Sequence, residues 1–363
     1  MSDLGELAPV PAGSVLLHIG PHKTGTTALQ NALRAARDDL LAQGVRYAGT
    51  RSSRDAEAAR HAIGRRTVRD EATAEAAAAA WREVRDRLND ASVPRRAFSS
   101  ESLANADDQG AARVVGDLGP AEVVITVRAL ADVLPSQYSQ FVQRGLATAE
   151  YPRWVEAVLA RDESVPTVRA FWRRHSHDAH VRRWGAVVGM EHVTVLVVDD
   201  HDRDFLPAAF ERLLALRPGT LAERIGRVRA NRSLTAAETE LVRRWHLECA
   251  AAGLDREQVR RWTWRACDRL RAVDPRPTAP RLALPAWAVE QANARAAEAA
   301  TSIAASGARV VGDLGRLSAA TARPGAITEP VRAIDTRLAA DFAVGLALHS
   351  DAQVAARLAT GDA

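Results

Sequence analysis

The segment that most constrains the fold is an apolar run, a glycine-rich turn and a helical pattern in direct succession near the N-terminus. Residues 14–19 (SVLLHI) form a short apolar run between Gly13 and Gly20, which predicts a buried strand. Residues 26–41 follow with leucines at helical spacing and predict a helix. A glycine turn between a strand and a helix directs backbone N–H groups and the positive end of the helix dipole at one point. The segment therefore predicts an anion-binding site.

The next part of the chain alternates between strand and helix patterns. We predict further strands at residues 45–48, 96–100, 122–128 and 192–198. The helices predicted between them are at residues 71–88, 132–144, 151–160 and 167–188. Because the strands alternate with helices, the predicted fold class is α/β, with a mostly parallel sheet and helices on both faces.

Beyond about residue 203 the pattern becomes helical. Helices are predicted at residues 204–216, 235–249, 255–273 and 285–306, with a proline-rich connection at residues 274–280. We therefore expect a core at residues 1–230 and a helical C-terminal part of the same domain at residues 231–363. The string ARVVGDLG occurs at residues 112–119 and again at 308–315, with different flanks. Each copy is predicted to mark the edge of a strand or a turn.

Composition excludes several classes of protein. Hydrophobic residues make up 47% and charged residues 26%, as in an ordinary globular chain. The net charge of +4 is too small to indicate nucleic-acid binding, and no apolar run reaches the roughly 20 residues of a membrane span. The acidic N-terminus does not predict a signal peptide, and Cys249 and Cys267 make no disulfide framework. We therefore expect a cytoplasmic protein.

The glycine turn contains the single lysine of the chain, Lys23, whereas the other 48 of the 49 lysines and arginines are arginines. Gly20 and Gly25 have the spacing of the two glycines in the nucleotide-binding pattern G-x-x-x-x-G-K-[ST]. Thr26 stands where that pattern requires lysine, and only Thr27 matches the hydroxyl that binds Mg²⁺. The turn can hold a phosphate but is not an NTPase loop; the alternative is a glycine turn with an exposed lysine.

Residues 18–27 (HIGPHKTGTT) resemble the 5′-phosphosulfate loop of sulfotransferases that use 3′-phosphoadenosine 5′-phosphosulfate (PAPS). That loop is commonly written [PH]-K-[TS]-G-[TS]-[TS] and follows the first strand. The family's second signature is a strand ending in Arg, with a Ser about eight residues later, and Arg128 and Ser136 match it. The resemblance implies a parallel sheet of the P-loop type. The cofactor-binding residues that it implies are Lys23, Thr24, Gly25, Thr26 and Thr27 for the 5′-phosphosulfate, and Arg128 and Ser136 for the 3′-phosphate.

The likeness extends along most of the chain to a bacterial branch of sulfotransferase-like proteins. It is carried by Phe171-Trp172, Arg183-Trp184, the strand at 192–198, and residues 231–234 and 310–314. The pair His175-Ser176 departs from the Gln-Asp pair expected after Phe-Trp. In the family, the loop that contains Arg232 closes over PAPS, so Arg232 would reach the 3′-phosphate. The alternative is that Ser233 or Thr235 caps the next helix.

The acceptor hydroxyl needs a general base, because an alcohol is a poor nucleophile. Glu101 is the first candidate, since it follows the strand at 96–100 and should lie at the carboxyl edge of the sheet, where ligands bind in open α/β folds. The alternative is that Glu101 begins a helix capped by Ser99 or Ser100.

Five histidines lie in or near these motifs. His22, beside Lys23, is the second candidate for the base, or else a loop histidine that only orients the phosphate. His18, inside the apolar strand, is expected to be a core histidine with its hydrogen bonds satisfied. The spacing of His175, His177 and His180 is similar to that of a metal site, but residues two apart on a helix diverge by about 200°. We therefore expect a polar helix face there and no metal.

Lys23 is predicted to be catalytic, together with Glu101 or His22. An ammonium group can follow the charge that moves onto the bridging oxygen of the leaving phosphate. The sequence thus predicts an enzyme, a sulfotransferase that moves a sulfuryl group from PAPS to a hydroxyl or amine of a carbohydrate, glycolipid or small-metabolite acceptor. No metal, nucleic-acid or membrane partner is expected. The alternatives are a P-loop nucleotide kinase or NTPase, and a non-catalytic nucleotide-binding protein.

Overall fold

The chain forms two compact units. A computed structural model describes residues 4, 7–65, 71–199, 202–225, 232–274, 278–322 and 328–360. The first unit is made of three segments, Met1–Leu130, Arg173–Ala230 and Asn293–Ala320. The second unit is made of the segments between and after them, Ala131–Trp172, Asn231–Ala292 and Thr321–Ala363.

Within the described residues, the first unit contains one parallel sheet of six strands in the order β2-β3-β1-β4-β5-β6. The strands are β1 (Val15–Ile19), β2 (Val45–Tyr47), β3 (Arg95–Ser99), β4 (Ala121–Val127), β5 (Val193–Val197) and β6 (Arg309–Val311). Every residue of β1 and β5 is buried, which explains why both strands read as continuous apolar runs instead of alternating ones. The predicted α/β class with a mostly parallel sheet is confirmed.

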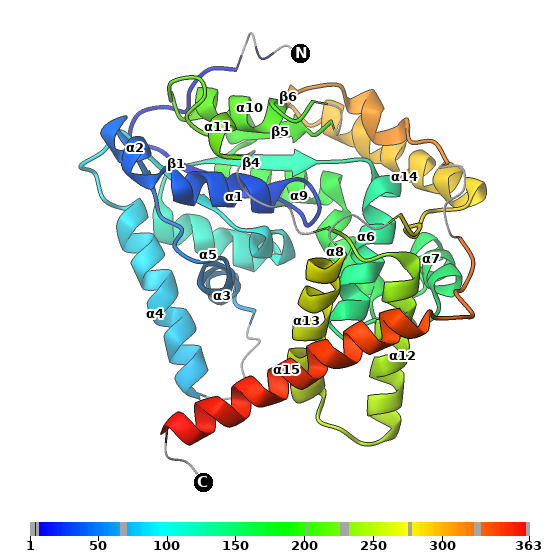
Figure 1. The fold of residues 1–363 in the computed structure, drawn as a ribbon. Coiled ribbons are helices and arrows are strands. Elements are labelled where there is room, and N and C mark those ends of the chain that lie inside the picture. The colour runs from blue at the N-terminus through cyan, green and yellow to red at the C-terminus, as the bar shows by residue number, and fades with distance from the viewer. Residues whose placement is uncertain are drawn as a thin grey trace. The chain divides into compact units, whose positions relative to one another are not determined.

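Helices cover both faces of this sheet, as predicted. One face carries α1 (Thr26–Ala35), α2 (Arg37–Ala42), α10 (Phe205–Leu213) and α11 (Ala222–Ile225). The other carries α3 (Ser52–Ala62), α4 (Glu71–Leu88), α5 (Asp108–Leu118) and α9 (His177–Val188). Figure 1 shows α10 and α11 on one side of the strands and α4 and α5 on the other. Trp81 of α4 packs edge-on against Phe98 of β3, with ring centroids 6.3 Å apart.

Three predictions about single elements differ from the structure. The segment expected to be helical at residues 167–188 is divided at Ser176 into α8 (Val168–His175) and α9. The helix expected at residues 26–41 is broken at Ala36, whose φ of −92° and ψ of 6° end α1 and begin α2. The first ARVVGDLG copy, expected at a strand or turn edge, lies inside α5. Its helix begins because the Asp107 carboxylate accepts a hydrogen bond from the Gly110 N–H at 2.8 Å, and it buries Val114 in the core.

The second unit is helical in the described residues. Its helices, some shared with the first unit, are α6 (Leu130–Gln143), α7 (Tyr151–Ala160), α8 (Val168–His175), α12 (Ala236–Ala251), α13 (Arg256–Val273), α14 (Ala286–Ala304) and α15 (Thr336–Thr360). The helices predicted at residues 235–249, 255–273 and 285–306 are present as α12, α13 and α14, whereas Arg309–Val311 of the expected helical part form β6. None of the helices in the described ranges is long and apolar enough to cross a membrane.

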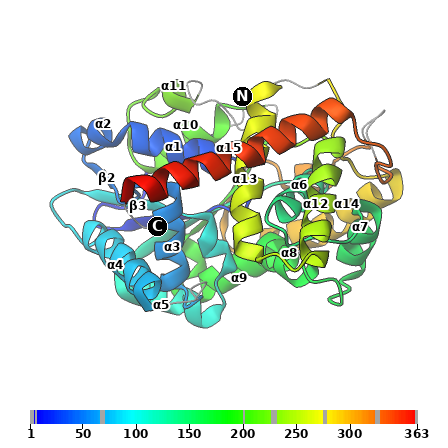
Figure 2. The same ribbon diagram turned by 60° about the horizontal axis from the view of Figure 1, so that its bottom comes forward.

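Aromatic residues and a close helix crossing hold the second unit together. Trp154 lies 5.2 Å from Tyr138 and 5.7 Å from Phe171 between ring centroids. Figures 1 and 2 show α15 crossing α13. At this crossing, a Cβ atom on Gly345 would lie 2.9 Å from the Cβ of Arg269, so only glycine fits without a shift.

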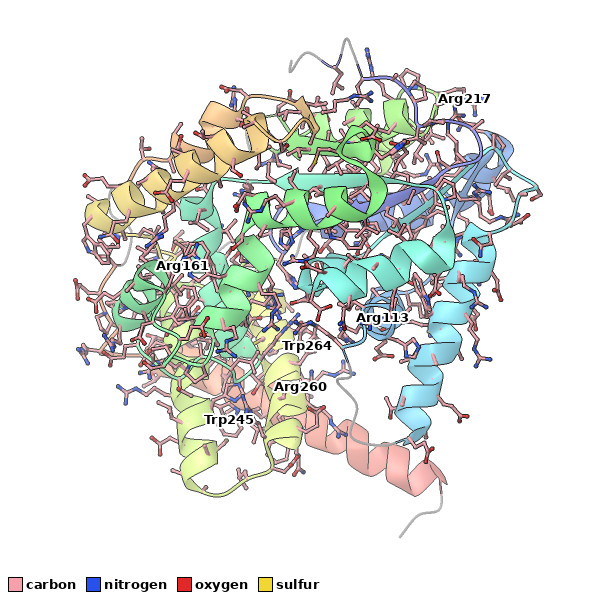
Figure 3. All side chains as sticks on the ribbon, turned by 180° about the vertical axis from the view of Figure 1, so that it is seen from behind. Arg113, Arg161, Arg217, Trp245, Arg260 and Trp264 are labelled. Carbon is pink, nitrogen blue, oxygen red and sulfur yellow. The ribbon has the colours of Figure 1, made fainter. Side chains whose placement is uncertain are left out.

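The tryptophans of α12 and α13 differ in exposure. Trp245 packs edge-on against Phe342 at 5.9 Å, and its indole N–H donates to Thr263 Oγ1. Trp264 is instead 54% exposed on the surface of α13 (Figure 3). It lies one residue beyond the buried Thr263, so it faces away from the stripe that α13 packs inward.

Candidate functional site

The turn between β1 and α1 is tightly wound. Gly25, at φ +83°, and Lys23, at φ +75°, both adopt the left-handed conformation, which costs a lysine about 1 kcal/mol. A Cβ atom on Gly20 would lie 2.9 Å from the imidazole of His18, so that position has no room for a side chain. Gly25 precedes α1 without a side-chain cap, so the first N–H groups of the helix face the turn. This arrangement suits an anion.

A chain of buried hydrogen bonds supports the turn from the inside. The Thr24 hydroxyl donates to Pro21 O at 2.8 Å and lies 2.7 Å from Thr126 Oγ1. His18 lies 3.2 Å from Thr126 Oγ1 through Nε2 and 2.8 Å from Ser99 Oγ through Nδ1. Because Thr24 gives its one proton to Pro21, Thr126 donates to Thr24, and His18 Nε2–H donates to Thr126.

This network explains the state of His18. Its side chain is fully buried, and burial lowers its pKa from 6.5 to about 3, so the imidazole is neutral at pH 7. The prediction of a satisfied core histidine is confirmed. Thr126 was not found by sequence reasoning, since nothing in the apolar run at residues 122–128 marks it as the partner of a histidine on another strand.

The two candidate bases contact each other. His22 Nδ1 lies 3.2 Å from Glu101 Oε1, with side-chain exposures of 6% and 28%. β1 and β3 are neighbouring strands, so the segments that follow them bring the two residues together. A carboxylate only accepts, so the proton of a neutral His22 lies on Nδ1 and Nε2 keeps its lone pair. This arrangement of a carboxylate orienting an imidazole is typical of general bases.

The alternative role of Glu101 also holds. Glu101 is the first residue of a short 3₁₀ helix, η1 (Glu101–Asn105), and the Ser100 hydroxyl accepts from the Ser102 N–H at 3.3 Å. The capping serine therefore fixes the backbone of Glu101 at the carboxyl edge of the sheet. Glu101 can therefore begin this helix and contact His22 at the same time.

Arg128 lies beside the turn. It follows β4, which pairs with β1 on the side opposite β3, and its Nη1 donates to the carbonyl oxygen of Lys23 at 2.9 Å. Lys23 itself is half-buried. The structure thus brings His22, Lys23, Glu101 and Arg128 together around the ends of three adjacent strands.

The remaining predicted residues differ in their surroundings. Thr26 is buried, with its hydroxyl 3.3 Å from that of Thr24, whereas Thr27 is exposed in the first turn of α1. Ser136 belongs to α6 in the second unit, where its hydroxyl donates to Val133 O at 3.0 Å.

Three buried histidines lie at the end of α8 and in α9. His175, His177 and His180 are at most 5% exposed, so the expected polar helix face is wrong. His177 Nε2 donates to Arg128 O and His180 Nε2 to Arg174 O, each at 3.1 Å, which satisfies one nitrogen of each ring inside the protein. Burial lowers the pKa of His180 to about 4 and also lowers that of His177. Among the described residues, no three His, Cys, Asp or Glu side chains form a group that could hold a metal ion.

Arg232 is engaged within the second unit. Its guanidinium donates to Glu238 at 2.6 and 2.7 Å and to Leu270 O at 2.9 Å. Thr235 and Glu238 form a capping box at the start of α12, so capping by Thr235 is confirmed. Asn231, quoted for the family resemblance, lies outside the described residues.

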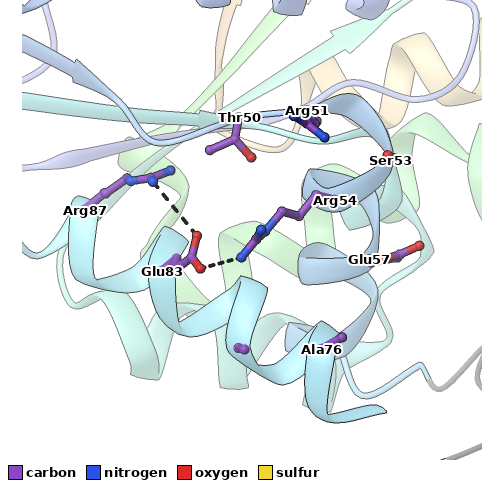
Figure 4. A pocket seen from close by; sticks show the side chains of 9 residues that line it. Thr50, Arg51, Ser53, Arg54, Glu57, Ala76, Glu83 and Arg87 are labelled. Atoms are coloured by element: carbon purple, nitrogen blue, oxygen red, sulfur yellow. Dashed lines mark hydrogen bonds and ion pairs between the residues drawn. The ribbon is translucent and has the colours of Figure 1, made fainter. Parts of the chain in front are cut away.

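A cavity of about 580 Å³ lies between α3 and α4 (Figure 4). Its charged lining residues are Arg51, Arg54, Glu57, Glu83 and Arg87. Glu83 already pairs with Arg54 and with Arg87, at 3.9 Å for the latter. Two of the three arginines thus share one carboxylate within the protein, and no residue of the turn lines this cavity.

Comparisons with known proteins identify no family for the chain. Neither a scan against protein-family models nor a search of curated proteins gave a match. A search of solved structures matched the crystal structure of a sulfotransferase from Alicyclobacillus acidocaldarius, at 16% identity and a TM-score of 0.41, over 69% of this chain and 99% of that one. At this distance no residue role is transferred from one chain to the other.

Proposed function

We propose that this protein is a PAPS-dependent sulfotransferase that moves a sulfuryl group to a hydroxyl group of an acceptor. The observation that carries the proposal is the contact between His22 and Glu101 beside Lys23, at the turn whose sequence resembles a 5′-phosphosulfate loop. A base, a cation and an anion cradle at one sheet edge are the parts that sulfuryl transfer needs.

In this proposal the turn holds the 5′-phosphosulfate. The N–H groups at the start of α1 point at its oxygens, and the exposed Thr27 supplies a hydroxyl donor. Arg128 supplies a guanidinium for the 3′-phosphate, a geometry that suits a phosphate better than an ammonium does. Thr24 supports the turn from inside, because its hydroxyl already donates to Pro21.

The reaction follows from these positions. His22 Nε2 takes the proton of the acceptor hydroxyl, and the Glu101 carboxylate stabilises the imidazolium that forms. The acceptor oxygen forms a bond to sulfur while the bond from sulfur to the bridging oxygen breaks, and its electron pair stays on the 5′-phosphate. Lys23 stabilises the negative charge on that oxygen. The products are the sulfated acceptor and adenosine 3′,5′-bisphosphate.

A radiolabel-transfer assay tests the proposal. Wild-type protein is incubated with [³⁵S]PAPS and a panel of carbohydrate, glycolipid and small hydroxyl or amine acceptors. We expect label to move to at least one class, and Lys23→Met and His22→Ala to abolish most of the transfer. The cavity residue Arg54, exposed and paired with Glu83, gives a matched control in Arg54→Met, which should leave transfer unchanged.

The outcomes separate the competing functions. Binding of PAPS with no transfer to any acceptor would favour a non-catalytic nucleotide-binding protein. Binding of ATP with Mg²⁺, but not of PAPS, in a thermal-shift screen would favour a kinase or NTPase. Full activity of Lys23→Met would remove the assigned role of this lysine.

A further inference from the structure

Lys23 has an unfavourable backbone conformation, and a hydrogen bond from Arg128 fixes the backbone there. Lys23 has a φ of +75°, which lies in a region that residues other than glycine rarely adopt. The carbonyl oxygen of this same residue accepts a hydrogen bond from Arg128 Nη1 at 2.9 Å. The bond fixes the peptide group that follows the strained φ, and it is charge-assisted, hence stronger than a bond between neutral groups.

The backbone of Arg128 is fixed in turn by His177. The His177 Nε2 lies 3.1 Å from the carbonyl oxygen of Arg128. A carbonyl only accepts, so Nε2 carries the proton and donates it. His177 is the first residue of α9, which packs against β4, and its side chain is 5% exposed. Burial lowers the pKa of His177, which keeps the ring neutral in this tautomer.

These two bonds connect separate parts of the first unit. The first runs from α9 to the residue after β4, and the second runs from there to the turn after β1. Both acceptors are backbone carbonyls, so each bond depends on the donor side chain alone. The same Arg128 is the residue proposed to bind the 3′-phosphate, which gives it two tasks at one guanidinium.

We propose that Arg128 and His177 form a brace that couples recognition of the 3′-phosphate to the placement of the Lys23 ammonium. The coupling rests on the proposed sulfotransferase function. A nucleotide with a 3′-phosphate holds the Arg128 guanidinium in place and thereby the backbone of Lys23. A nucleotide that lacks the 3′-phosphate, such as adenosine 5′-phosphosulfate, does not hold the Arg128 guanidinium in place. His177 is in this view a positioning residue, since it acts through Arg128.

The brace predicts a specific kinetic signature. If Arg128 only bound the 3′-phosphate, a nucleotide that lacks this phosphate would have a higher KM and an unchanged kcat. With the brace, adenosine 5′-phosphosulfate should also give a kcat at least about tenfold lower than PAPS, because a small displacement of a catalytic group costs a large factor in rate. The variant His177→Ala should lower kcat with PAPS by about tenfold, and the ratio of the two kcat values should shrink.

His180 offers a matched control on the same helix. It is also buried and also donates from Nε2 to a carbonyl, that of Arg174, at 3.1 Å. His180→Ala should lower the melting temperature about as much as His177→Ala does, yet leave the kcat ratio of the two nucleotides unchanged. His177→Gln restores a donor at the position of Nε2 and should recover most of kcat.

The measurement is steady-state transfer with PAPS and with adenosine 5′-phosphosulfate for the wild type and the three variants, with thermal melting of each. Calorimetric titration of the wild type with adenosine 3′,5′-bisphosphate is run alongside. A wild type that neither binds this product nor transfers label overturns the proposed function and the coupling with it. An active wild type overturns the coupling alone if His177→Ala and His180→Ala change the kcat ratio equally, or if His177→Gln behaves like His177→Ala.

Discussion

The inner and outer sides of the turn between β1 and α1 carry similar residue types with different partners. On the inner side, His18 and Thr24 are fully buried, and their partners, such as Thr126, are other protein groups. On the outer side, His22 is also buried, at 5% exposure, but it contacts Glu101, whose side chain is 28% exposed. His18 and His22 lie four positions apart, so sequence proximity does not decide their roles.

The difference shows how one short segment serves both stability and chemistry. A histidine whose two nitrogens are bonded to buried hydroxyl groups has no nitrogen left for a substrate, whereas one oriented by a carboxylate keeps a lone pair for a proton. Substitutions on the outer side should therefore change activity at nearly constant stability. Substitutions on the inner side should change stability at nearly constant activity.

The largest effect is expected for Lys23→Met. Methionine keeps the length of the side chain and removes the charge that stabilises the leaving oxygen, so kcat should fall by about 10³-fold. The melting temperature should stay close to that of the wild type, since Lys23 is half-buried on the outer side. Initial rates and thermal melting measured on the same preparations check this. A large fall in melting temperature would place Lys23 with the inner residues.

The next effect concerns the pair of His22 and Glu101. His22→Ala and Glu101→Gln should each lower kcat by about 10²-fold, because each removes part of one general base. The double variant should be no slower than the slower single variant, since the two act as a unit. A double-mutant cycle on kcat measures this. Effects that multiply would mean that the two residues act independently.

The inner side is tested by Thr126→Val, which keeps the shape of the side chain. It leaves His18 Nε2–H without its acceptor and removes the donor to Thr24, so unfolding should become easier by about 2 kcal/mol. Below the melting temperature, kcat should change by less than about threefold, which corresponds to under 0.7 kcal/mol. Urea unfolding and initial rates measure the two quantities. Thr194→Val, at a position that is also buried, on β5, is the control for the loss of a hydroxyl alone.

The smallest effect is the contribution of His18, on the inner side, to the pH dependence of the free energy of unfolding. Burial lowers the pKa of His18 to about 3 from 6.5, so between these values the unfolded chain binds a proton that the folded chain does not. Stability is therefore complete above pH 6.5 and falls as the pH decreases, by about 1.4 kcal/mol per pH unit for each such histidine. Urea unfolding at pH 7.5, 6.5 and 5.5 measures the slope. His18→Gln should flatten it, and an unchanged slope would mean that His18 does not titrate on unfolding.

The sequence predicted those parts of the fold that depend on local patterns. The bounds of α4 were predicted without error, because an alanine-rich run with a regular apolar stripe favours a helix in any context. The turn was predicted because glycine spacing and Lys23 are local features. The pairing of His22 with Glu101 was not predicted, because it depends on β3 lying next to β1 in the sheet.

The repeated string ARVVGDLG shows the limit of local patterns most directly. Its first copy is helical in α5, where the Asp117 carboxylate accepts from the Trp81 indole N–H at 2.7 Å. Its second copy contributes Arg309–Val311 as β6, which pairs with β5, and the glycine after the strand, Gly312, adopts a φ of +95°. Identical residues thus become helix or strand according to the cap before them and the strand beside them. No pattern inside the string could have distinguished the two.

The single lysine of the turn allows this site to be labelled selectively. An acylating reagent that targets amines finds one ε-amino group in the whole chain, in the peptide that ends at Arg34. Fragmentation of this peptide separates an adduct on Lys23 from one on the α-amino group of Met1, so the adduct on Lys23 reports on the turn. The same adduct counts unoccupied turns without any turnover. A bound nucleotide that covers the ammonium should slow the labelling, and titrating that protection gives a dissociation constant before any acceptor has been identified.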